Sequence, residues 1–111
     1  TTTGPSQVIE LRDGAIAHFT VDPAELGLAR ATPDDLTGGD RATNAAVVRR
    51  VLGGDPGPHR DIVLLNAAAG IHVGGRVESL AEGLELAAHS IDSGAASGTL
   101  DRLVAASQAP A

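Results

Sequence analysis

The segment from about His59 to Val73 constrains the fold most, because the helix that it predicts is apolar on nearly every side. Four consecutive aliphatic residues, Ile62-Val63-Leu64-Leu65, are followed closely by three alanines and Ile71. A helix with this pattern is buried on most sides. A chain of 111 residues buries only about two-thirds of the surface that it exposes when unfolded, so it supplies few neighbours for such a helix. We therefore expect this chain to pack against more protein than it contains.

A β-hairpin is predicted at residues 7–21. Asp13-Gly14 supplies the two residues with positive φ that a type I′ turn needs, and apolar and polar residues alternate around it. One hairpin alone is marginally stable, so it needs a partner sheet or helix. The alternation divides the second strand into two faces, which are Ile16, His18 and Thr20, and Ala15, Ala17, Phe19 and Val21.

Residues 22–39 are predicted to connect the hairpin to a helical part at 40–106. In this connection Asp22 caps a short helical turn, Pro23 suits its first position and Gly27 ends it, and a second turn is expected at 32–36. Asp40 then caps a helix that runs to about Leu52. The buried face of that helix is expected to hold Ala45, Val48, Val51 and Leu52.

Two further helices are predicted. The predicted architecture is therefore a hairpin followed by about four helices, and it forms one partial domain at residues 1–111. Ser79 and Glu82 form a capping box that opens the first, and Gly94 closes it. The second begins at Ser97. The first is expected to bury Leu80, Leu84, Ala87, Ala88 and Ile91, and the second Leu100, Leu103 and Val104.

The composition excludes several kinds of chemistry. The absence of Cys excludes disulfides and thiolate metal sites, and the absence of Lys excludes P-loop and Schiff-base chemistry. Phe19 is the only aromatic residue, and the net charge is −6, so a nucleic-acid partner or a membrane surface is not expected. We expect a cytoplasmic protein, because no apolar run approaches the ~18 residues of a transmembrane helix and no secretory leader is present.

Two acidic segments could hold a phosphate or a metal ion. Thr37-Gly38-Gly39-Asp40 opens a helix, where backbone N–H groups can bind phosphate, but Asp40 puts a negative charge there. We favour helix capping for this segment. Asp34-Asp35 could hold Mg²⁺ together with phosphate oxygens, whereas solvated acids in the first turn of a short helix are more common.

The remaining polar residues predict no catalytic set. The histidines at 18, 59, 72 and 89 lack metal-ligand spacing, and no nucleophile elbow surrounds Ser79 or Ser93, which could otherwise join His89 and Asp92 in a triad. Asn44 and Asn66 are expected to lie inward, where an unpaired amide costs about 1–3 kcal/mol. For Asn66 we favour a structural bond, to Asp61 or the 37–40 turn, over contact with a ligand.

Five segments occur in an order that is similar to the later part of a known enzyme family. They are Thr3-Gly4-Pro5-Ser6 with Val8-Ile9-Glu10-Leu11 and Asp13-Gly14; Pro23-Ala24-Glu25-Leu26-Gly27-Leu28; Leu36-Thr37-Gly38-Gly39-Asp40 with Asn44-Ala45 and Val51-Leu52-Gly53-Gly54; Arg60-Asp61 with Leu65-Asn66-Ala67-Ala68-Ala69; and Ser79-Leu80-Ala81-Glu82-Gly83 with Ile91-Asp92-Ser93-Gly94-Ala95. The family that they resemble is the anthranilate phosphoribosyltransferases. The absence of Met is expected for a C-terminal piece of such an enzyme.

The resemblance implies a large α/β domain similar to that of class II nucleoside phosphorylases, beside a small helical domain. It implies Mg²⁺-dependent transfer of phosphoribose from phosphoribosyl pyrophosphate to anthranilate in tryptophan synthesis, in an enzyme that is often homodimeric. The family's diphosphate loop, its Lys-His-Gly-Asn segment, its anthranilate-binding Arg and its acidic metal pair precede the stretch that matches Thr1. The resemblance therefore implies no catalytic, substrate-binding or metal residue in positions 1–111.

Three roles follow from this resemblance. The chain could be a C-terminal scaffold segment that is inactive alone and needs the remainder of the enzyme. It could be one chain of a split enzyme, or a non-catalytic remnant or interaction module of the same fold. A large exposed apolar patch would favour a missing partner, and a polar surface would favour an independent module.

Overall fold

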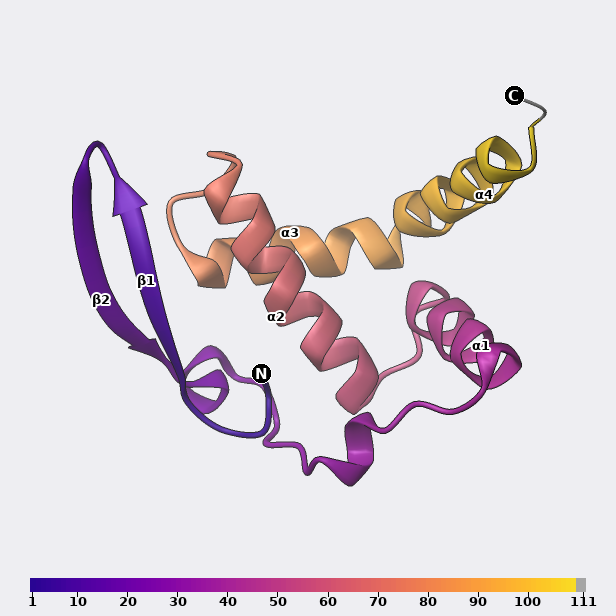
Figure 1. The fold of residues 1–111 in the computed structure, drawn as a ribbon, viewed down its shortest axis with the longest axis horizontal. Helices are drawn as coiled ribbons and strands as arrows, with labels where there is room; N and C mark the ends of the chain where they lie inside the picture. The colour runs from indigo at the N-terminus through magenta and orange to yellow at the C-terminus, as the bar shows by residue number, and fades with distance from the viewer. Residues whose placement is uncertain (110–111) are drawn as a thin grey trace.

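A two-stranded antiparallel hairpin is followed by four α-helices in the computed structural model of this chain, which describes residues 1–109 (Figure 1). This confirms the predicted architecture. None of the helices in that range is long and apolar enough to cross a membrane. In order, the elements are β1 (Ser6–Arg12), β2 (Ala15–Val21), the 3-10 helices η1 (Pro23–Leu26) and η2 (Asp34–Leu36), α1 (Arg41–Leu52), α2 (Pro58–Val73), α3 (Leu80–Asp92) and α4 (Ala95–Gln108).

The hairpin turns at Asp13-Gly14, as predicted, with φ values of 50° and 77°. The register pairs Val8 with Phe19 and Leu11 with Ile16, so each pair shares one face of the sheet. The outer face, which we define as Ile9, Leu11, Ile16 and His18, is open to solvent. Its three aliphatic side chains are 68%, 72% and 66% exposed in chain order.

The core lies where α2 crosses α3, because each of these helices presents a stripe of small and aliphatic residues to the other. Ala68 is fully buried, and a Cβ on Gly83 would lie 2.8 Å from the Ala68 carbonyl oxygen. The absence of a side chain at Gly83 is what allows the two backbones to approach. The buried members of this core cluster are Val51, Leu64, Ala68, Leu84, Ala87 and Ile91.

The connection between the hairpin and α1 holds the first residues of the chain in place. Asp22 caps η1 by accepting a hydrogen bond from the Ala24 N–H at 3.0 Å, and Gly27 ends it with φ 76°, as predicted. The Ala31 N–H donates to the Thr2 carbonyl at 3.0 Å. Thr2 and Pro23 are both fully buried, so this connection anchors the base of the hairpin.

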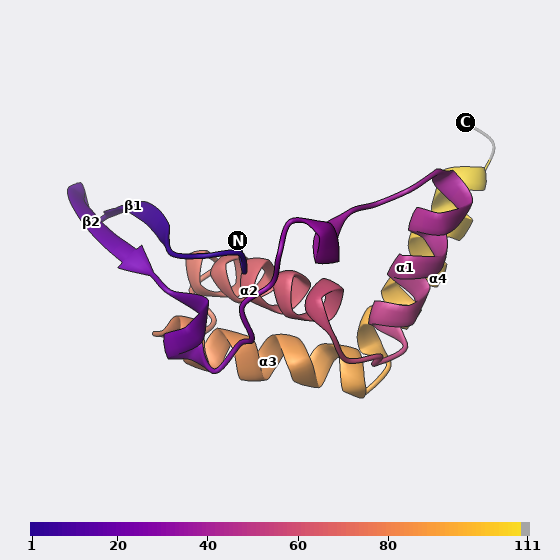
Figure 2. The same ribbon diagram turned by 90° about the horizontal axis from the view of Figure 1, so that it is seen from below.

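The described residues do not enclose α2 on most sides, as expected for an apolar helix to which this chain supplies few neighbours. Leu64, Leu65 and Ala68 are buried, but Val63 is 40% exposed and Val73 is 85% exposed. The hairpin stands to one side of α2, and α3 covers only the opposite side (Figures 1 and 2). The apolar sequence of α2 therefore exceeds what its neighbours in this chain cover.

The outer helices are also more exposed than predicted. In α1 only Val51 is buried, whereas Ala45 is exposed and Val48 is 44% exposed. In α4, which begins at Ala95 rather than Ser97, Leu103 and Val104 are 64% and 37% exposed. Gly94 closes α3 as expected, in the left-handed conformation with φ 80° directly after the C-cap Ser93, and it is also the N-cap of α4. Both helices lie at the end of the molecule opposite the hairpin, with few elements beside them (Figure 2).

Candidate functional site

A groove of about 420 Å³ separates β1 from α2 and is lined mainly by apolar residues. The hairpin side is formed by Ser6 and Val8–Leu11 of β1 with Phe19 and Val21 of β2. The α2 side is formed by one helix face. This face consists of Leu65, Asn66, Ala69, His72 and Val73, spaced as residues of a single helical stripe.

One end of the groove is closed by a polar contact between the hairpin and α2. His72 Nε2 lies 3.2 Å from Glu10 Oε1 and 3.2 Å from Arg12 Nη2, and Glu10 and Arg12 form an ion pair at 3.5 Å. His72 Nδ1 donates to the Val77 carbonyl at 3.3 Å, because a carbonyl can only accept. With Nδ1 as a donor, Nε2 accepts from Arg12 in the neutral form of His72. In the charged form, Nε2 donates to Glu10.

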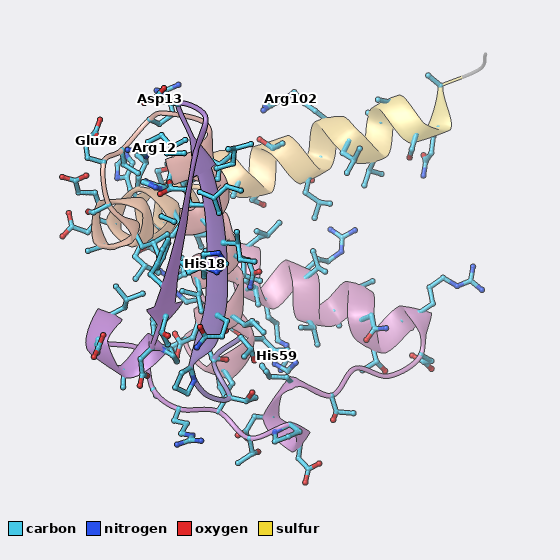
Figure 3. The ribbon with its side chains drawn as sticks, turned by 60° about the vertical axis from the view of Figure 1, so that its left-hand side comes forward. Arg12, Asp13, His18, His59, Glu78 and Arg102 are labelled. Carbon is cyan, nitrogen blue, oxygen red and sulfur yellow. The ribbon has the colours of Figure 1, made fainter. Side chains whose placement is uncertain are left out.

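Further charged groups line the space beside this contact. Asp13 and Glu78 line a second hollow of about 370 Å³ together with Glu10, Arg12 and His72. Figure 3 shows Arg12 and Asp13 at the tip of the hairpin, near Glu78 of the loop before α3. Three carboxylates against one guanidinium line this second hollow, so its walls carry a net negative charge.

The two acidic segments singled out in the sequence serve local structure. Asp35 accepts hydrogen bonds at 2.7 Å from the backbone N–H and the hydroxyl of Thr32, and these bonds lower the pKa of its carboxyl below the ordinary value. Asp40 caps α1, as predicted. The backbone N–H of Thr43 donates to it at 2.8 Å and lowers the pKa of Asp40. Both carboxylates are thus engaged by their own chain.

The two asparagines are exposed, so the prediction that they lie inward is wrong. Asn44 makes the bond to the 37–40 turn that had been considered for Asn66. Its Oδ1 accepts from the Gly39 N–H at 2.8 Å, and its Nδ2 donates to the Gly39 carbonyl at 2.9 Å. Asn66 donates to the Ile62 carbonyl of its own helix at 2.8 Å and lines the groove.

No triad forms from the serines, His89 and Asp92. Ser79 caps α3 in a capping box with Glu82, as predicted. Asp92 pairs with Arg60 of α2 at 2.9 Å, and the hydroxyl of Ser93 donates to the Ser90 carbonyl. Figure 3 places His18 on the hairpin and His59 at the start of α2, so these rings belong to different parts of the molecule.

The described residues do not fit a Mg²⁺ site. Mg²⁺ is usually held by one or two carboxylates in an octahedral set of oxygen ligands. Asp35 of the Asp34-Asp35 pair already accepts two hydrogen bonds from Thr32. Among residues 1–109 no three His, Cys, Asp or Glu side chains lie close enough together to hold a metal ion.

Two contacts were missed by sequence reasoning, the Glu10–His72–Arg12 cluster and the Arg60–Asp92 ion pair. Each joins residues that are distant in sequence, 62 positions for Glu10 and His72 and 32 for Arg60 and Asp92. The strand alternation places Glu10 on the same face as Val8, which was the one available signal for the first. The second had none, because Arg60 was noted only for the resemblance, and Asp92 only for the resemblance and for a possible triad.

Comparison with known proteins identifies the class. A family model described as "Glycosyl transferase family, a/b domain" matches residues 1–97. This chain belongs to that glycosyl transferase family.

Within this class, relatives that match nearly the whole chain carry one name. The chain is 58% identical to an anthranilate phosphoribosyltransferase of Methylobacterium nodulans over 109 residues, which is 98% of this chain and 32% of that protein. It is 57% identical over 106 residues to anthranilate phosphoribosyltransferase 2 of Streptomyces coelicolor, covering 96% and 32%. The crystal structure of anthranilate phosphoribosyltransferase from Thermus thermophilus superposes with a TM-score of 0.83 at 40% identity, covering 93% of this chain and 31% of that one.

The resemblance inferred from the sequence motifs is thereby confirmed. The chain spans about a third of the length of the relatives that it matches.

Proposed function

We propose that this chain is the C-terminal segment of an anthranilate phosphoribosyltransferase, which transfers phosphoribose from phosphoribosyl pyrophosphate to anthranilate in tryptophan biosynthesis. The observation that carries the proposal is the identity of 57–58% over nearly the whole chain to relatives with that name. In the reaction, fixed charges stabilise the developing oxocarbenium ion and the departing pyrophosphate. We place this reaction in the cytoplasm.

The role of this segment is to support the active site rather than to supply its reacting groups. Residues 1–111 form the C-terminal portion of the α/β domain. The hairpin and α2 form the wall and floor beneath the active site. The Asp35, Asp40 and Asn44 side chains are engaged in capping and turns, which supports a structural role for them. Mg²⁺, which would assist the departing pyrophosphate, is held by residues of the intact enzyme outside this chain.

The partner of the segment is the remainder of the same enzyme, and the intact protein is a homodimer. The aliphatic side chains of the hairpin and one face of α2 are exposed. This exposure favours a segment that other protein covers over an independent module. In a split enzyme, the remainder is a separate polypeptide that covers the same exposed surfaces.

A chimaera tests the proposal. Residues 1–109 replace the matching segment of the Methylobacterium nodulans relative, and formation of phosphoribosyl anthranilate is measured with phosphoribosyl pyrophosphate, anthranilate and Mg²⁺. We expect the chimaera to be active and the isolated chain to be inactive under the same conditions. A folded but inactive chimaera, or an active isolated chain, would contradict the proposed function.

A further inference from the structure

The tip of the hairpin carries the only Asp-Gly pair of the sequence, Asp13-Gly14, and the sequence has no Asn-Gly pair. Glycine has no side chain that could hinder its backbone nitrogen from attacking the side chain of the preceding aspartate. Both residues are exposed, and a Cβ on Gly14 would meet no atom within 4 Å. Figure 3 shows Asp13 at the tip of the hairpin. The two groups that would react are therefore open to solvent and have room to move.

The turn leaves the backbone of this pair outside the hydrogen-bonded ladder. The register of the two strands ends at the pair of Arg12 and Ala15, so the two residues between them belong to no strand pair. Within residues 1–109, no backbone hydrogen bond is donated by the Gly14 N–H. Asp13 has φ 50°, a conformation that few residues other than glycine adopt. The ladder therefore does not hold Asp13 against the rotation that brings its side chain to the Gly14 nitrogen.

Asp92, which also precedes a small residue, provides a contrast within the chain. Its side chain is 58% exposed, so exposure alone does not distinguish it from Asp13. Its carboxylate oxygens lie 2.9 and 3.0 Å from Nη2 of Arg60, however. The Ser93 nitrogen, which would have to attack, donates to the His89 carbonyl at 2.9 Å. Both reacting groups of this second pair are engaged by hydrogen bonds at the end of α3.

We propose that Asp13-Gly14 is a site of spontaneous isoaspartate formation. The Gly14 nitrogen forms a bond to Cγ of Asp13 and gives up its proton, and the carboxyl group loses its hydroxyl. Proton and hydroxyl leave as water, and a succinimide ring is closed. Water then adds to one of the two ring carbonyl carbons. Addition at Cγ restores aspartate, whereas addition at the main-chain carbon of Asp13 breaks its bond to the Gly14 nitrogen and leaves the chain linked through Cγ.

This product changes the hairpin although it leaves the composition of the chain unchanged. The main chain gains one methylene at the tip, and a type I′ turn requires two central residues of ordinary length with positive φ. The pairing of Arg12 with Ala15 beside the turn is therefore lost. Arg12 lies 3.2 Å from His72 and 3.5 Å from Glu10, so the change reaches the contact between the hairpin and α2. The inference goes beyond the proposed function and does not depend on it.

Incubation of the folded chimaera described above in heavy-oxygen water at neutral pH tests the site, because each passage through the ring inserts one solvent oxygen. Mass spectrometry of the peptides that contain Asp13 and Asp92 measures the label. A methyltransferase specific for the free α-carboxylate of isoaspartate identifies the product. We expect the labelling rate of Asp13 to lie within about threefold of its rate in urea, and Asp92 to be labelled at least about tenfold more slowly than in urea. Protection of Asp13 as strong as that of Asp92 would show that the proposal is wrong.

Asp13→Gly is the matched control, since glycine adopts positive φ and has no carboxyl group. We expect this variant to take up no label at position 13 and to keep the amides of Arg12 and Ala15 protected throughout the incubation. In the isoaspartate fraction of the unsubstituted chimaera, these amides should exchange at least about tenfold faster than in fresh protein. An equal loss of protection in the variant would show that the tip opens without the reaction, which contradicts the proposal. The readouts require a folded chimaera, as measured by circular dichroism, and not an active one, so failure of the proposed function is a separate result.

Discussion

The α2–α3 pair buries its apolar residues within the chain, whereas the hairpin leaves most of its own exposed. Ala68, Leu84 and Ala87 are between 0% and 8% exposed, while Ile9, Leu11 and Ile16 are between 66% and 72% exposed. Both regions carry local sequence signals that stabilise their elements, a capping box in α3 and a type I′ turn in the hairpin. Local signals therefore specify the elements of both regions, but only the helix pair packs its apolar residues against other residues of this chain.

This difference separates the part of the chain that is stabilised by its own contacts from the part that depends on other protein. The helix pair approaches closely because Gly83 meets Ala68, and the Arg60–Asp92 ion pair joins the same two helices. The hairpin contacts α2 through Glu10 and His72 at one end, and elsewhere the groove separates the two elements. Substitutions should accordingly have large effects in the first region and small ones in the second.

The largest effect is expected from Leu84→Ala. Leu84 is 8% exposed within the core cluster, so its truncation should lower the free energy of unfolding by about 3 kcal/mol. Leu103→Ala is the matched control, because Leu103 is a helical leucine that is 64% exposed, and it should change stability by less than about 0.5 kcal/mol. Urea denaturation followed by circular dichroism measures both. Similar losses would show that α4 is as well packed as α3.

A smaller effect is expected, with opposite signs, at Gly83 of α3 and Gly70 of α2. The Cβ of Gly83→Ala would lie 2.8 Å from the Ala68 carbonyl oxygen, so the helices must separate at a cost of about 1–3 kcal/mol. Gly70→Ala meets no atom within 4 Å and should stabilise α2 by up to about 1 kcal/mol, because alanine favours the helix. Thermal denaturation of both variants is the measurement. A stabilising Gly83→Ala would mean that the crossing is looser than described.

Local sequence signals predicted the elements well, because the residues that make them are neighbours. Asp13-Gly14, Asp40 and the Ser79–Glu82 pair form the turn and the caps that their sequence predicts. Which apolar faces are covered was predicted poorly. Periodicity shows that Val48 and Leu103 lie on apolar stripes, but whether another element covers a stripe depends on the rest of the fold.

The candidate site was less accessible to sequence reasoning than the fold. The groove arises from the placement of β1 beside α2, which lies much later in the chain, and no local pattern specifies that placement. The interpretation of α2 as a helix that needs additional neighbours pointed to the right surface, since Val73 and Ala69 line the groove. It did not indicate that an edge of the hairpin forms the other wall.

The hairpin itself should tolerate substitution on its outer face. Ile16→Thr keeps a β-branched residue at an exposed position, so the free energy of unfolding of the isolated chain should change by less than about 0.5 kcal/mol. The variant should be more soluble, because an exposed aliphatic cluster promotes association. Denaturation and the concentration at which the chain precipitates are the two measurements. A loss above about 1 kcal/mol would show that this face packs within the chain.

The smallest expected effect is a pH dependence at the start of α1. The Thr43 N–H donates to Asp40 and holds the pKa of that carboxyl below its ordinary 3.8, so the charged carboxylate stabilises the fold. Because the folded pKa is the lower one, this contribution is complete above pH 3.8 and is lost as pH falls through the folded value. Asp40→Asn keeps a capping oxygen but cannot titrate. Its melting temperature should therefore fall less than that of the unsubstituted chain between about pH 6 and about pH 2.5. Asp35, whose pKa is also lowered, titrates in both proteins, so the comparison isolates Asp40. Identical pH profiles would show that the cap contributes equally in its charged and neutral forms.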